Sequence, residues 1–127
     1  MKNNIFYTFI VIFFFFSLNL FSEELEINSD KIQYDDVSKI SIFEGNVNIK
    51  DEKGNKLFSE YSEYDKLKQL VKTAGETKII TSGGYEVSSS NVIFDHANKI
   101  IRSDYKTQIV DKDGNKVFVD MFNYSVL

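Results

Sequence analysis

Few side chains in this 127-residue chain could carry chemistry. His96 is the single histidine and there is no cysteine, so a serine or carboxylate has no obvious partner for nucleophilic or general base catalysis. His96 lies in a polar turn, where equivalent positions elsewhere in the chain hold Asp36 and Lys66, and we expect its side chain to be exposed to solvent. The sequence predicts no catalytic residue and therefore no enzyme.

One segment resembles the start of a calcium-binding loop. Asp111, Asp113 and Asn115 place oxygen atoms at alternate positions, as an EF-hand does. An EF-hand, however, has glycine at its sixth position and glutamate at its twelfth, whereas Gly114 is fourth here and no glutamate follows. An acid followed by glycine is typical of a hairpin turn, so we expect neither a metal site nor a cofactor.

A unit that repeats every 30 residues must position these side chains. Its first mark is an aromatic residue at Tyr34, Tyr64, Phe94 and Tyr124, and its second is a glycine at Gly54, Gly84 and Gly114. A repeat of this length indicates a supersecondary unit that buries its apolar face only by stacking on its neighbours.

Each unit is predicted to contain two β-strands. Short runs of Ile, Val, Phe, Tyr and Thr alternate with polar residues and end in Gly, Asn or Asp, which predicts an all-β fold. The alternation changes parity between Ile42 and Val47 and again after Ile100. We therefore expect bulges or bends near Gly45 and near Ser103-Asp104. Bends at matching heights would turn the sheet into a folded-over, solenoid-like trough.

The repeating apolar positions are the candidates for a binding site. They share one face of the sheet, and two interpretations stay open. The side chains either fill a core or line an open groove that admits an apolar ligand such as a fatty acyl chain. The groove candidates are Ile32, Tyr34, Val47, Ile49, Tyr64, Ile79, Val92, Phe94, Ile109, Phe122 and Tyr124.

The amino terminus and the charge restrict the compartment and the partners. Residues 1–22 have a basic start, an apolar run and a small residue at Ser22, which predicts a secretory signal peptide; residues 5–21 could alternatively be a membrane anchor. Residues 23–127 then form the exported domain. The net charge of −4 disfavours nucleic acid as a partner.

Several motifs, taken in order, resemble a known family. They are S-D-K-I-x-Y-D at 29–35, F-E-G-N-V-x-I-x-D at 43–51, the pair Tyr64-Asp65 and T-A-G-E-T at 73–77. Their order and spacing are similar to those of the OstA-like domain of lipopolysaccharide-transport proteins, from Glu26 to Tyr124. That family includes a soluble periplasmic bridge protein, a member anchored in the inner membrane, and the amino-terminal domain of the outer-membrane translocon.

The resemblance implies an open β-jellyroll in the periplasm of a Gram-negative cell, associated with the outer membrane. It also implies a non-catalytic role in a bridge that carries lipopolysaccharide to the outer membrane and the translocon, with the lipid A acyl chains in the trough. The jellyroll domains of such a bridge stack by edge strands, here at Ile27, Val117, Phe118 and Val119. The chain ends within a fourth unit, so we expect the domain to be incomplete at its carboxyl terminus.

An alternative interpretation belongs to a different functional class. A repeating β-fold with a closed core would serve as a structural periplasmic solenoid, or as an interaction domain, without binding lipid. The sequence pattern is the same in both cases, because a filled core and a lined groove place apolar residues at the same positions.

Overall fold

The computed structural model describes residues 24–126, so the predicted signal peptide at 1–22 lies outside the described residues. These residues form strands joined by turns. The strands are β1 (Glu26–Asn28), β2 (Lys31–Asp35), β3 (Ile40–Lys50), β4 (Lys56–Asp65), β5 (Leu70–Thr73), β6 (Glu76–Ile80), β7 (Glu86–Ser90), β8 (Ile93–Asp95), β9 (Ile100–Ser103), β10 (Thr107–Val110), β11 (Lys116–Val119) and β12 (Phe122–Ser125). Residues 24–126 contain no helix long and apolar enough to cross a membrane.

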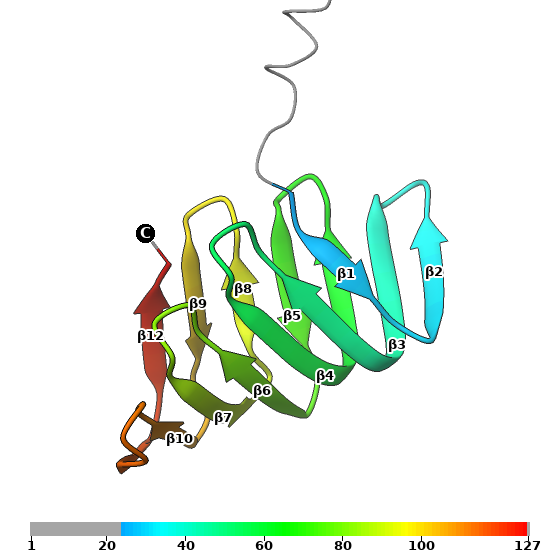
Figure 1. Ribbon diagram of the computed structural model, residues 1–127. Coiled ribbons are helices and arrows are strands. Elements are labelled where there is room, and N and C mark those ends of the chain that lie inside the picture. Colours follow the sequence, from blue (N-terminus) through cyan, green and yellow to red (C-terminus); the bar gives the residue numbers. More distant parts are fainter. Residues whose placement is uncertain (1–23, 127) are drawn as a thin grey trace, which may run out of the picture.

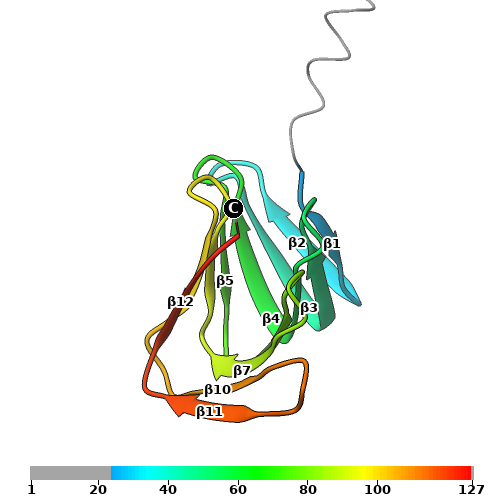
Figure 2. The ribbon, with the colours of Figure 1, turned by 60° about the vertical axis from the view of Figure 1, so that its left-hand side comes forward.

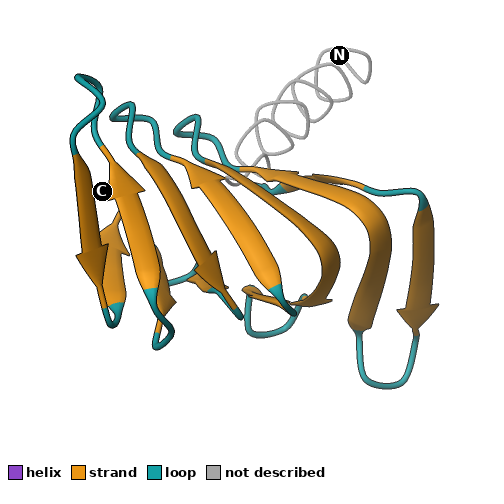
Figure 3. Ribbon diagram, turned by 90° about the horizontal axis from the view of Figure 1, so that it is seen from below, coloured by secondary structure: helices purple, strands orange, loops and turns teal. Residues whose placement is uncertain are grey.

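All twelve strands belong to one antiparallel sheet that folds over into two walls (Figures 1 and 2). Wall A consists of β2, β5, β8, β9, β12, residues 40–44 of β3 and residues 61–65 of β4. Wall B consists of β1, β6, β7, β10, β11, residues 47–50 of β3 and residues 56–59 of β4. Figure 3 shows long strands bending from one wall into the other. The predicted all-β open jellyroll is confirmed.

The bends lie where the sequence predicted them. Within β3 the register against β4 shifts between Glu44 and Val47, and the intervening Gly45 and Asn46 have φ angles of 77° and 48°. The predicted bend near Ser103-Asp104 separates β9 from β10. Glycine and asparagine tolerate positive φ, which a sharp bend requires.

One reason for predicting those bends was wrong. The argument from the change in parity assumed that the side chains of Ile42 and Ile100 face the interior. The neighbouring Phe43 and Ile101 are instead the buried side chains, so Ile42 and Ile100 lie on the outer side of wall A. The alternation of a strand fixes two faces but does not say which of two adjacent isoleucines is inside.

The hairpin turns form the two free rims of the trough. Wall B has turns at 51–55, 81–85 and 111–115, in which Gly54, Gly84 and Gly114 have φ angles between 85° and 91°. The Asp111 carboxylate accepts hydrogen bonds from the backbone of Asp113 and from the backbone and side chain of Asn115. These bonds lower the Asp111 pKa, the Asn115 side-chain bond most. Residues 111–115 form the predicted hairpin turn.

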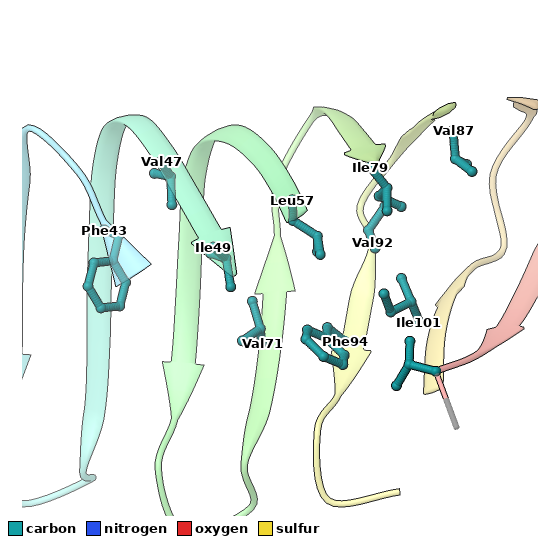
Figure 4. Packing of buried hydrophobic residues seen from close by; sticks show 11 residues of the cluster. Phe43, Val47, Ile49, Leu57, Val71, Ile79, Val87, Val92, Phe94 and Ile101 are labelled. Atoms are coloured by element: carbon teal, nitrogen blue, oxygen red, sulfur yellow. The ribbon is translucent and has the colours of Figure 1, made fainter. Parts of the chain in front are cut away.

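The core lies between the walls (Figure 4). Leu57 and Ile49 from wall B meet Val71 and Phe94 from wall A. The buried apolar side chains are Phe43, Val47, Ile49, Leu57, Val71, Ile79, Val87, Val92, Phe94, Ile101 and Val126.

Candidate functional site

Strand register aligns the predicted groove residues in rows along the trough. In wall B, Ile49 pairs with Leu57, which pairs with Ile79, and the row continues through Val87 to Ile109. Directly paired residues point to the same side of a sheet, so these side chains form one continuous apolar strip.

Wall A carries a second strip on its inner side. Tyr64 pairs with Val71, Val71 with Phe94, and the row continues through Ile101 to Tyr124. The two strips face each other across the interior. The repeat columns read from the sequence are therefore real rows in space.

Burial of the groove candidates falls from the middle of the trough to its ends. Val47, Ile49, Ile79, Val92 and Phe94 are at most 1% exposed. Four further candidates are partly buried against this core: Tyr64, Ile109, Phe122 and Tyr124. The last two, at the first edge of wall A, are exposed: Ile32 by 58% and Tyr34 by 54%.

The predicted partner residues lie on the edge strands. β1 and β2 pair with β3, whereas β11 pairs with β10 and β12 with β9, so one side of each edge strand remains unpaired. Ile27 packs against the core, Val119 is half-buried, and Val117 is 53% exposed. Phe118, at 74% exposed, has the opposite orientation to Val117 and Val119, and lies on the outer side of wall B.

A ladder of buried hydroxyl groups along the fold line was missed by the sequence reasoning. Ser59 and Ser62 Oγ atoms are 2.8 Å apart, and Thr73 and Thr77 Oγ1 atoms are 2.6 Å apart. Further along, Ser89 Oγ lies 2.8 Å from the Oγ1 atom of residue 107. Small side chains let the walls meet sharply, and mutual hydrogen bonds satisfy the buried hydroxyls. The sequence did contain a signal for this ladder, because each of these residues lies two positions from an inward-facing apolar residue.

His96 is not exposed, contrary to the sequence prediction. Its side chain is 3% exposed and its ring lies edge-on to Phe94, with ring centroids 5.6 Å apart. His96 Nε2 lies 3.0 Å from Glu52 Oε2, and Lys99 Nζ donates to Glu52 Oε1 at 2.7 Å. Repeat position predicted a solvated turn, but the opposite rim covers this turn. We call Glu52, His96 and Lys99 the rim clasp.

Electrostatics at the clasp favour the ionised carboxylate. Desolvation by itself would raise the Glu52 pKa, but hydrogen bonds from Lys99 and His96 outweigh it and lower the pKa from 4.5 to about 2. Tyr64, half-buried in wall A, changes in the opposite way: desolvation and then the charge of Glu24 raise its pKa. The clasp pairs donors with one carboxylate and holds it ionised.

A hollow of about 1100 Å³ lies outside the trough, along the outer face of wall B. Its lining includes the outward-facing Asn48, Lys78, Gln108 and Phe118, together with neighbouring residues such as Ser59, Thr77 and Thr107. The lining does not include Ile49, Leu57, Ile79, Val87 or Ile109, which form the inward strip of wall B. Of the eleven groove candidates, only Val47 borders the hollow.

Comparisons with known proteins place the fold. No family model matches the chain, and no curated protein matches its sequence. The solved structures include a match to LptH from Pseudomonas aeruginosa, described as the LptA-homologous periplasmic component of the conserved lipopolysaccharide transport device. The TM-score is 0.69 at 12% identity, and the match covers 82% of this chain and 77% of LptH. The fold is therefore an LptA-like β-jellyroll.

Proposed function

We propose that this chain is a non-catalytic, periplasmic lipopolysaccharide-binding domain of a transport bridge. The observation that carries the proposal is one folded sheet with two facing apolar strips and unpaired edge strands at both ends, in an LptA-like fold. Acyl chains of lipid A would lie between the strips. Burying a CH₂ group contributes roughly 0.8 kcal/mol, so a chain of about a dozen carbons could gain on the order of 10 kcal/mol before ordering costs.

The edges supply the route for assembly. Unpaired backbone groups on β2 and β11 can extend the sheet into another jellyroll domain, because strand addition satisfies both partners. Exposed Tyr34 at one end and Val117 at the other would then be covered. Continuous stacking would join the apolar strips of successive domains and of the outer-membrane translocon into one path.

Photo-crosslinking tests the lipid site with a matched pair of phenylalanines. Phe122 is half-buried and packs against the core, whereas Phe118 lies outside, four residues away. With benzoylphenylalanine at each position in turn, we expect a crosslink to purified lipopolysaccharide from position 122 and little from position 118. Equal crosslinking from both positions, or none from position 122, would contradict the proposal.

One observation favours a second candidate, a structural interaction domain that binds no lipid. The middle of the trough is packed, with Val92 and Phe94 at 0% exposed. Organic extraction of protein purified from its native envelope, followed by mass spectrometry, separates the two functions. A co-purifying lipid with acyl chains supports transport, whereas an extract without lipid supports the structural role.

A further inference from the structure

The rim clasp joins the two walls at one point along the trough. Glu52 is on the β3–β4 turn of wall B, whereas His96 and Lys99 are on the β8–β9 turn of wall A. Figure 1 shows the β3–β4 turn beside β8. Glu52 is 44 positions from His96 and 47 positions from Lys99 in the chain, so these two contacts connect the rim of wall B to the rim of wall A.

The repeat does not dictate this contact. At the position equivalent to Glu52, the backbone of Ser82 donates to Asn55, which belongs to the same wall. At the position equivalent to His96, Asp36 pairs with Lys39 inside its own turn, at 2.8 Å. The clasp is therefore a local addition to the repeating architecture.

The clasp lies directly over the packed middle of the trough. The His96 ring packs against Phe94, a fully buried member of the inner strip of wall A. An acyl chain that enters sideways at this rung has to separate Glu52 from its two donors. A cationic ammonium and an imidazole N–H are also the groups that bind phosphate or carboxylate.

We propose that His96 and Lys99 form a binding site for the anionic headgroup of an amphiphile, and that Glu52 occupies this site in the empty protein. This inference rests on the proposed function. An incoming carboxylate or phosphate takes the two donors, the rims separate, and the attached chain reaches the apolar strips. The clasp thereby couples headgroup binding to opening of the trough.

Affinity measurements test the exchange. Glu52→Gln removes the competing charge, so we expect it to bind dodecanoate about tenfold more tightly than the unaltered chain. Glu60→Gln, at an exposed position by the fold line, is the matched control for net charge, and its affinity should be unchanged. Lys99→Gln should weaken dodecanoate binding, Lys99→Arg should largely restore it, and dodecyl maltoside should bind all variants alike.

Distance measurements test the opening. The chain has no cysteine, so spin labels can be attached at Lys53→Cys and Ala97→Cys, in exposed turns on opposite rims. We expect dodecanoate to lengthen the distance between these labels. A control pair on a single wall, Lys53→Cys with Ser82→Cys, should not respond. Circular dichroism of each variant checks that the sheet remains folded.

The outcomes separate this inference from the proposed function. Bound dodecanoate with an unchanged distance across the rims, or equal affinities for Glu52→Gln and Glu60→Gln, would overturn the clasp while leaving lipid binding in place. Inorganic phosphate opening the rims as well as dodecanoate would assign the site to a free anion and overturn the link to a lipid. Failure of every amphiphile to bind would overturn the proposed function and the clasp together.

Discussion

The middle of the trough and its two ends are built from the same 30-residue unit, yet they differ in what surrounds them. Phe94 in the middle is fully buried, whereas Tyr34, its counterpart at the first edge, is 54% exposed. Both face the interior side of wall A. The difference arises because strands on both sides and the opposite wall cover Phe94, while Tyr34 lies on a strand with a single neighbour.

The middle and the ends of the trough therefore have different physical properties. The middle supplies stability, because apolar burial, paired hydroxyls and the rim clasp coincide there. The ends expose edge strands with apolar residues, which are features that favour strand addition.

The largest effect on stability is expected from a substitution in the middle of the trough. Phe94→Ala should lower the free energy of unfolding by about 3–5 kcal/mol, because it leaves a cavity in a packed interior. Tyr34→Ala, the same column at the edge, should lower it by less than about 1 kcal/mol. Urea denaturation of both variants measures the difference. Similar losses at the two positions would show that edge and middle are equally stabilising.

A second effect comes from the fold line. Thr73→Val removes the acceptor of the Val92 N–H and the partner of the Thr77 hydroxyl, both buried, and should destabilise by about 1–3 kcal/mol. The control is Ser88→Val on the outer face of β7, which should change stability by at most about 0.5 kcal/mol. If Thr73→Val is neutral in urea denaturation, the hydroxyl ladder does not stabilise the bend.

We expect the rim clasp to contribute to the stability of the fold in a way that depends on pH. The Glu52 pKa is lower in the folded chain than its ordinary 4.5, so its stabilising effect is complete above about pH 4.5 and is lost as the pH falls to about 2. We expect Glu52→Gln to be less stable than the unaltered chain by about 1–2 kcal/mol near neutral pH, allowing for partial exposure. Thermal unfolding across this range should show the two curves converging towards pH 2.

The smallest effect on folding is expected at the edge. Val117→Lys places a charge on the exposed strand β11 and should change the unfolding free energy by at most about 0.5 kcal/mol. It should nevertheless weaken stacking of one domain on another. Sedimentation at rising protein concentration measures the association, with Ser88→Lys as a control for the added charge. Equal association of both variants would place the contact elsewhere.

Much of the fold could be predicted because strand alternation and turn residues can be recognised within each 30-residue unit. Strand alternation identified the strip residues such as Ile49 and Ile79, and glycines identified the turns and the bend at Gly45. The choice between the adjacent Ile100 and Ile101 could not be made, because both suit a strand and only packing against the opposite wall decides. The signal peptide at 1–22 remains a prediction.

The candidate site was predicted in part for the same reason. The sequence identified some of the positions that face inward, including Val92 and Phe94, but not how far neighbouring strands would cover each of them. The hydroxyl ladder was overlooked because serine and threonine usually lie on the solvated surface of a protein. His96 was misjudged because its surroundings come from a turn 44 residues away.

The sequence by itself determined a thirty-residue β-repeat, its bends, and the rows of apolar side chains, since these follow from alternation and backbone preference within each unit. Only the tertiary structure decided that the rims meet, that Glu52 bonds to His96 and Lys99, and that burial declines towards the edges. Those features depend on how one wall lies over the other, and such distances between segments remote in the chain are not encoded in any local pattern.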